Sequence, residues 1–128
     1  MAHKEPMRYG NVVEEYFGYS QAVKAGDTIH VSGQTAFVED EDLPEGMADQ
    51  MRAAYANIAD VLDFYGASLD DVVEEVVFVT DMEAAMAVAN EVRHEVWGPH
   101  FEVASTLVQV VALAVPEVLV EIKVTARL

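Results

Sequence analysis

The fold of this chain is decided by residues 19–35, YSQAVKAGDTIHVSGQT, which read as two short strands joined by a Gly-Asp turn. In the second strand, Ile29 and Val31 alternate with polar residues, as expected of a strand with one buried face. This strand runs into Ser32 and Gly33. A glycine at a strand end marks either a β-bulge or a place where a ligand or another backbone approaches closely.

Working outward, the remaining periodicities predict one α+β domain over residues 1–128, in the order β-β-β-α-β-α-β-β. Apolar residues recur at helical spacing over residues 47–65, and again between Asp81 and Gly98. Residues 1–11 are expected to form a loosely ordered lead-in. Besides the hairpin, strands are expected at residues 12–17 (an edge strand), 72–79, 103–113 and 118–126.

Several short motifs follow one another in a recognisable order. They are YSQAV, VSGQT, Gln50-Met51-Arg52 with Asn57-Ile58, VFVTDM at residues 77–82, and Val120-Glu121-Ile122. In order and spacing they resemble the RidA/YjgF family of reactive intermediate deaminases, also labelled endoribonuclease L-PSP. The resemblance covers most of the chain, from about residue 19 to residue 126, and implies a chorismate-mutase-like fold with two helices on one face of a mixed sheet.

The expected strands at 72–79 and 103–113 are apolar on both faces, yet two helices can cover only one face of the sheet. A large exposed apolar patch is unusual in a soluble monomer, so a homo-oligomer is expected. The resemblance makes it a homotrimer whose small-molecule ligand binds in clefts between subunits.

The composition bounds the possible partners. The 128 residues include 23 acidic and 7 basic side chains, which gives a net charge of −16. Such a surface repels phosphate backbones, so nucleic-acid binding is not expected, which weighs against the endoribonuclease label. The charge fits either a well-solvated surface or a protein from a high-salt cytoplasm, where self-repulsion is screened.

No metal, cofactor or membrane is expected as a partner. The four histidines show no ligand spacing, there is no cysteine, and no phosphate-binding glycine loop or nucleophile elbow occurs. No apolar run is long enough to span a membrane, and the first residues lack a signal-peptide pattern, so a cytoplasmic location is expected. The histidines are His3, His30, His94 and His100.

Glu121 is the candidate catalytic residue. By pattern alone it alternates with Leu119 and Lys123, which is also typical of a solvent-facing carboxylate. The resemblance implies that Glu121 holds the water that attacks the substrate, and that Tyr19 lines the same cleft. It also implies that the strand end at Ser32 and Gly33 offers backbone groups to the substrate.

Ser105 is where the chain departs from the family pattern. In the deaminase branch, the corresponding arginine grips the carboxylate of a 2-imino acid through two charge-assisted bonds, whereas serine offers one neutral hydroxyl. We therefore expect Ser105 to line the cleft of an imine or enamine hydrolase whose substrate is not one of the usual 2-imino acids. The alternative is a non-catalytic metabolite-binding or regulatory protein of the same fold, and endoribonuclease activity is least expected.

Overall fold

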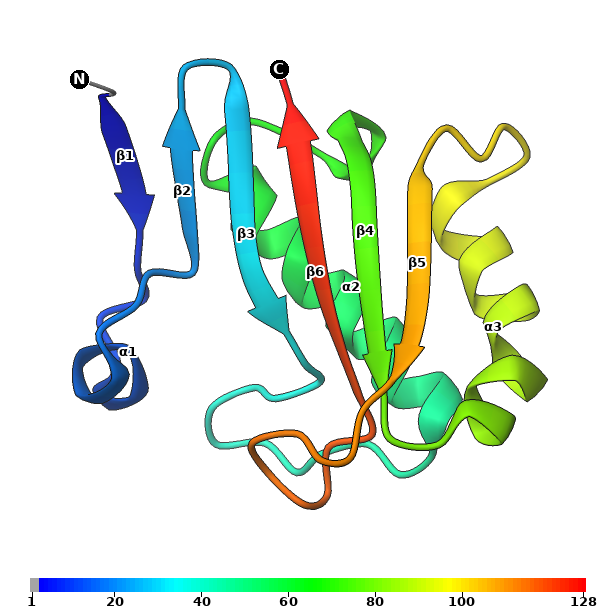
Figure 1. The fold of residues 1–128 in the computed structure, drawn as a ribbon. Helices are drawn as coiled ribbons and strands as arrows, with labels where there is room; N and C mark the ends of the chain where they lie inside the picture. Colours follow the sequence, from blue (N-terminus) through cyan, green and yellow to red (C-terminus); the bar gives the residue numbers. More distant parts are fainter. Residues whose placement is uncertain (1–2) are drawn as a thin grey trace.

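The computed structural model describes residues 3–128, whose strands form one six-stranded mixed sheet (Figure 1). The strand order is β1-β2-β3-β6-β4-β5; β4 and β5 are parallel, and all other neighbours are antiparallel. The α+β architecture expected from the sequence is therefore confirmed. The strands are β1 (Lys4–Met7), β2 (Ala22–Ala25), β3 (Thr28–Gln34), β4 (Val72–Val79), β5 (Ala104–Gln109) and β6 (Val120–Arg127).

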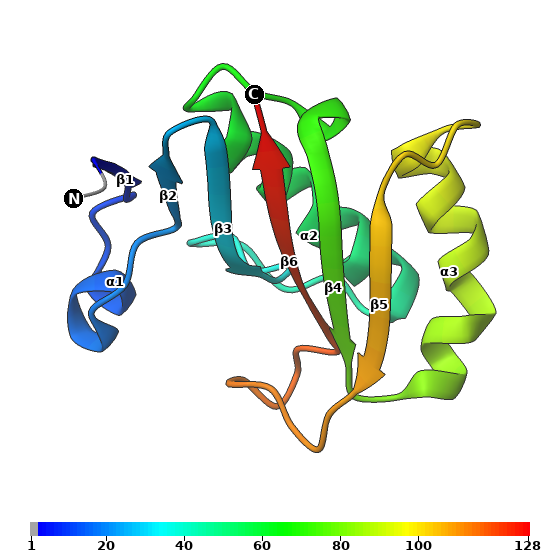
Figure 2. The same ribbon diagram turned by 45° about the horizontal axis from the view of Figure 1, so that its top comes forward.

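Two long helices, α2 (Met47–Asp63) and α3 (Met82–Trp97), cover one face of this sheet (Figures 1 and 2). Along α2, apolar residues at intervals of three and four are fully buried, as the periodicity predicts. The helix α3 begins after Asp81, whose carboxylate accepts a hydrogen bond from the backbone N–H of Ala84 at 3.0 Å. A 3₁₀ turn, Leu69–Asp71, leads into β4.

Strand β6 shows how the two faces of the sheet differ. Val120, Ile122 and Val124 point toward the helices and are at most 1% exposed. The alternating residues Glu121 and Lys123 point to the opposite face, which no long helix covers. That second face, the open face, is where the predicted catalytic residue lies. Among residues 3–128, no helix combines the length and apolar character needed to cross a bilayer.

The N-terminal part differs from the prediction. Residues 12–17 are not an edge strand but a short helix, α1 (Val12–Phe17), because Asn11 and Glu14 form a capping box. The β-branched pair at its start favours a strand by propensity alone. The strand that completes the sheet is β1, within the residues expected to be a loose lead-in. Residues 1 and 2 of that segment lie outside the described residues.

The hairpin of β2 and β3 is confirmed, with its turn at Gly26, whose φ is +62°. At the far end of β3, Val31 pairs with Val124 but Gln34 pairs with Ile122. Two residues of β3 therefore oppose one residue of β6, which is a β-bulge. At the C-terminal end, β5 is shorter than expected and stops at Gln109 rather than reaching residue 113.

Candidate functional site

The first group of predicted site residues gathers around the bulge, which consists of Ser32 and Gly33 opposite Lys123. A Cβ atom built on Gly33 would lie 2.7 Å from Cδ and 2.9 Å from Cγ of Glu121, closer than real Cβ contacts allow. Only glycine leaves room there for the Glu121 side chain. The expected β-bulge is therefore confirmed, and the group that lies against Gly33 in this chain is the side chain of Glu121; the approach of a ligand or another backbone stays a prediction.

Ser32 connects the bulge to the segment that carries Tyr19. The Ser32 backbone N–H donates to the carbonyl of Gln21 at 2.8 Å, and its hydroxyl donates to the carbonyl of Ser20 at 2.7 Å. Ser20 directly follows Tyr19, whose side chain is 38% exposed. The hairpin therefore holds Tyr19 beside the bulge with its ring open to a ligand.

Below this segment, the buried carboxylate of Glu14 anchors the end of α1. It accepts hydrogen bonds from three consecutive backbone N–H groups and, at 2.8 Å, from the side-chain amide of Gln21. Burial alone would raise the pKa of Glu14, but these hydrogen bonds outweigh it and hold the pKa below its usual value. The backbone of Tyr19 is bonded to the same residue, since its N–H donates to the backbone carbonyl of Glu14 at 3.1 Å.

The carboxylate of Glu121 itself is partly buried and stands free. Burial raises its pKa above the usual value for glutamate. Within residues 3–128 its side chain makes no hydrogen bond or ion pair, and its neighbour across the sheet is Phe78 of β4. A partly buried carboxylate without a hydrogen-bond or ionic partner is suited to hold a water molecule and to accept a proton from it.

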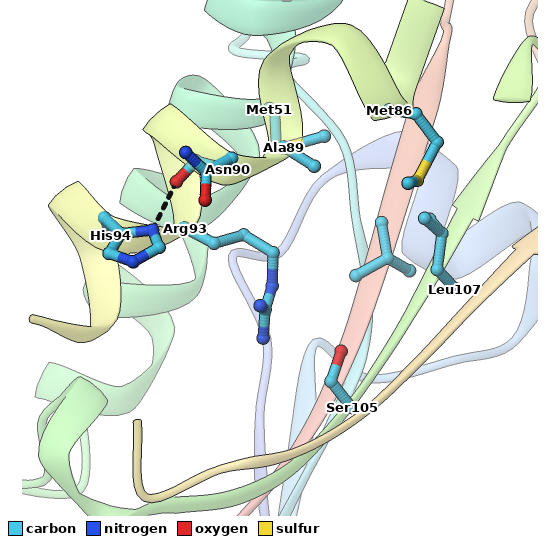
Figure 3. A pocket seen from close by; sticks show the side chains of 9 residues that line it. Met51, Met86, Ala89, Asn90, Arg93, His94, Ser105 and Leu107 are labelled. Atoms are coloured by element: carbon cyan, nitrogen blue, oxygen red, sulfur yellow. Dashed lines mark hydrogen bonds between the residues drawn. The ribbon is translucent and has the colours of Figure 1, made fainter. Parts of the chain in front are cut away.

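The second group lies on the other face of the sheet, where α3 and β5 enclose a pocket of about 310 Å³ (Figure 3). Ser105 of β5 lines it, and Arg93 extends from α3 toward Ser105. Its remaining polar lining comes from Asn90 and His94. The apolar lining residues are Met51, Val77, Met86, Ala89 and Leu107.

The floor of this pocket is held together by Glu75, whose side chain is completely buried. One carboxylate oxygen accepts a hydrogen bond from the Tyr55 hydroxyl at 2.6 Å. The other accepts from Arg93, through Nε at 3.0 Å and Nη2 at 2.7 Å, and from the Ser105 hydroxyl at 2.6 Å. Ser105, although itself exposed, is therefore engaged by a buried carboxylate in a four-residue cluster of Tyr55, Glu75, Arg93 and Ser105, the Glu75 cluster.

The charges of the Glu75 cluster stabilise one another. Desolvation works against the charge of Arg93, but the hydrogen bond and the charge of Glu75 outweigh it, so the pKa of the guanidinium is raised. Burial, followed by the charge of Glu75, raises the pKa of Tyr55 and keeps its hydroxyl a donor. Sequence reasoning missed Glu75 and Arg93 as site residues. The available signal was a glutamate on the helix-facing side of an apolar strand, which requires a buried donor.

The two groups lie on opposite faces of the same sheet. Glu75 pairs with Ser105 across β4 and β5, whereas Phe78 pairs with Glu121 across β4 and β6. Positions 75 and 78 of one strand point to opposite faces, because side chains alternate. The structure therefore brings Ser32, Gly33 and Glu121 together, bonds Ser32 to the residue that follows Tyr19, and separates Ser105 from them. In a single chain, the five predicted residues do not line one cleft.

No metal-binding constellation appears in the described part of the chain, since no three histidine or acidic side chains gather in it. Most of its cationic side chains are engaged by carboxylates. Arg52 contacts three acidic side chains at 2.9 to 3.7 Å, and Arg93 and Arg127 each contact one. Lys24 lies 3.4 Å from Glu5. These cations are spread over the molecule and form no basic surface.

Comparison with known proteins agrees with this fold. The sequence profile of the family described as Endoribonuclease L-PSP matches residues 11–128. The crystal structure of Rv2704 from Mycobacterium tuberculosis, a member of the YjgF/YER057c/UK114 family, superposes with a TM-score of 0.84 at 33% identity, covering 98% of this chain and 100% of that one.

Several curated relatives also match at the sequence level, two of which illustrate the range. One is the 2-iminobutanoate/2-iminopropanoate deaminase of Dermatophagoides farinae, 32% identical over 91 residues, or 70% of each chain. The other is the mitochondrial protein mmf2 of Schizosaccharomyces pombe, 39% identical over 77 residues; this match spans 60% of each chain. Profile, sequence and fold agree, and the chain belongs to the RidA/YjgF/YER057c/UK114 family, with its chorismate-mutase-like α+β fold.

Proposed function

We propose that this protein is a homotrimer that hydrolyses a small imine or enamine to a carbonyl compound and ammonia, in clefts between its subunits. The observation that carries the proposal is Glu121, a desolvated carboxylate with no partner among residues 3–128, lying against a glycine that makes room for it. The relative from Dermatophagoides farinae, named as a deaminase of two imino acids, supports the class of reaction.

In this reaction Glu121 accepts a proton from water while the water oxygen bonds to the imine carbon, and the C=N electron pair moves to nitrogen, which takes that proton from Glu121. The hydroxyl proton of the tetrahedral adduct then passes to the nitrogen by way of Glu121, the C=O bond forms, the C–N bond breaks and ammonia leaves; an enamine first tautomerises to the imine. The raised pKa of Glu121 brings its proton affinity closer to that required for such transfers near neutral pH. The bulge at Ser32 and Gly33 leaves backbone groups outside the regular ladder, where they can stabilise developing charge.

A cleft that contains both Glu121 and Ser105 requires a second copy of the chain, because one chain places them on opposite faces of its sheet. The open face supports such an assembly, since Val76, Phe78 and Val108 lie on it without a covering helix. Light scattering at micromolar concentration should give the mass of three chains. A monomer under these conditions would refute the assembly.

The hydrolase is tested by generating an imine in situ with an oxidase and following its disappearance with and without the protein. We expect faster decay with the native chain, and decay at the buffer rate with Glu121→Gln, which keeps the size of the side chain but cannot accept the proton. Imines generated from amino acids carry a carboxylate, whereas imines generated from simple amines do not, so the two sources distinguish anionic from uncharged substrates. If neither class decays faster than in buffer, the hydrolase proposal fails.

The substrate is proposed to differ from the usual 2-imino acids, because Ser105 stands where the deaminase branch carries its carboxylate-binding arginine. The Ser105 hydroxyl is already bound to Glu75 at 2.6 Å. The same observation favours a second candidate function, a metabolite-binding or regulatory trimer without catalysis. In that case a ligand would bind in the cleft, and Glu121→Gln would leave its affinity unchanged.

RNA cleavage is the least favoured function. The net charge of −16 and the carboxylates around Arg52, Arg93 and Arg127 leave no basic surface to follow a phosphate backbone. RNA cut by nuclease-free protein would overturn this reasoning. The cytoplasmic location stays a prediction, since several relatives are named as mitochondrial.

A further inference from the structure

We propose that Glu75 determines the class of ligand that the pocket beneath α3 accepts. The carboxylate of Glu75 occupies the donors of Arg93 and Ser105, so a ligand carboxylate is excluded. The pocket therefore selects uncharged imines or enamines with apolar substituents. The selection of uncharged ligands follows from the pocket alone. That these ligands are imines rests on the proposed function.

The hydrogen bonds on the pocket floor are the first support. The oxygen of Glu75 that faces Arg93 accepts three donors, from Nε and Nη2 of Arg93 and from the hydroxyl of Ser105. These are the kinds of donor with which proteins grip a ligand carboxylate. Here they already hold one, and the Tyr55 hydroxyl donates to its second oxygen at 2.6 Å.

Charge is the second support. Arg93 and Glu75 form an ion pair at 2.7 Å, so the floor of the pocket carries no net charge. A ligand carboxylate would lose its hydration on entry without gaining an unpaired cation, and an uncompensated buried charge is costly. The net charge of −16 further opposes an anion. Nη1 of Arg93, which has no partner among residues 3–128, remains as a donor for an imine nitrogen or a carbonyl oxygen.

The walls are the third support. Five of the nine lining residues are apolar, and Met86 and Leu107 stand at the end of the pocket away from His94 (Figure 3). Methionine adapts its shape to irregular apolar groups. The pocket thus combines an apolar wall with a neutral polar floor, an arrangement suited to a small molecule with an alkyl part and one uncharged polar end.

The test compares two ligands with the same carbon skeleton, 2-oxobutanamide and 2-oxobutanoate, whose dissociation constants are measured by NMR titration of the native protein. We expect the uncharged amide to bind at least about tenfold more tightly, the lower end of what one charged hydrogen bond contributes. Equal affinities, tighter binding of the carboxylate, or binding of neither ligand would each overturn the proposal.

The variant Glu75→Gln keeps the shape of the side chain and releases Arg93 from its counter-charge. We expect the affinity for 2-oxobutanoate to rise at least about tenfold, with that for the amide nearly unchanged. Glu74→Gln, which removes an exposed carboxylate from the neighbouring position of β4 outside the pocket lining, is the matched control and should keep the native preference. A folded Glu75→Gln variant with the native preference would contradict the proposal. If this variant does not fold, the comparison on the native protein still decides.

Glu121→Gln separates this inference from the hydrolase proposal. That variant should lose hydrolysis and keep the preference for the amide, because the substitution preserves the size of the side chain and leaves the bonds of Glu75 to Arg93 and Ser105 intact. A preference for the amide without any hydrolysis would refute the hydrolase proposal and leave the inference about Glu75 standing. Hydrolysis that is as fast with an anionic as with an uncharged imine would refute the inference about Glu75 and leave the hydrolase proposal standing.

Discussion

Replacing Gly33 with alanine is expected to reveal the contact with Glu121 as a coupling energy. The added Cβ would lie 2.7 Å from Cδ and 2.9 Å from Cγ of Glu121, so the acid side chain must leave its position. Inserting a methyl group into such a contact costs about 1 to 3 kcal/mol. Because Gly33 does not have a positive φ, alanine also gains about 0.4 to 1 kcal/mol through the unfolded chain.

The two effects separate in a double-mutant cycle. In the native background, Gly33→Ala should lower the free energy of unfolding by up to about 2.5 kcal/mol. In a Glu121→Ala background, the same substitution should raise it by up to about 1 kcal/mol. The expected coupling between the two positions is therefore about 1 to 3 kcal/mol. Urea unfolding at one fixed protein concentration measures it, since the stability of an oligomer depends on concentration.

Gly26→Ala supplies the matched control, because this glycine lies in the hairpin turn with no atom within 4 Å of a built Cβ. Its effect should be the same in both backgrounds. Additivity of Gly33→Ala and Glu121→Ala within about 0.5 kcal/mol would show that the carboxylate does not lie against the bulge. The site described around Gly33 would then be wrong.

Three further predictions concern charge and burial. Glu14→Gln should lower the free energy of unfolding, measured in urea, by about 1 to 3 kcal/mol at neutral pH. Because folding lowers the pKa of Glu14, the difference between the variant and the native protein should shrink as the pH falls below 4.5. A difference that does not change with pH would show that the charge of Glu14 is not what its hydrogen bonds stabilise. Tyr55→Phe removes one donor from the buried Glu75 and should cost about 1.5 to 3 kcal/mol in the same assay, whereas a cost near zero would show that the bond is unimportant. The melting temperature should be higher in molar KCl than in low salt, because salt screens the net charge of −16; no rise would remove the high-salt interpretation.

Most of the fold could be predicted because its signals are local. The helical stripe of α2, the alternation in β6 and the turn at Gly26 each reflect a single periodicity or a single residue. Residues 12–17 form a helix and not the expected strand because the Asn11-x-x-Glu14 capping box outweighs the strand propensity of Val12 and Val13. Strand propensity depends strongly on context, whereas the cap satisfies specific backbone donors.

The site could be predicted only in part, because it depends on pairings between distant strands. The position of Glu121 over Gly33 follows from the register of β3 and β6, with its bulge, which no local pattern specifies. The engagement of Ser105 by Glu75 and Arg93 joins three separate elements. Its only sign in the sequence was an acidic residue inside an apolar strand, and that sign does not identify the donor.

The two groups of site residues, on opposite faces of one sheet, are proposed to complete each other between copies of the chain. The native chain has no cysteine, so a double variant, Ser105→Cys with Glu121→Cys, carries only two thiols. Treated with a short bismaleimide and run on a denaturing gel, it should give covalent dimers and trimers, while each single variant stays at the mass of one chain. Single-chain bands alone, with both thiols modified, would contradict the shared cleft.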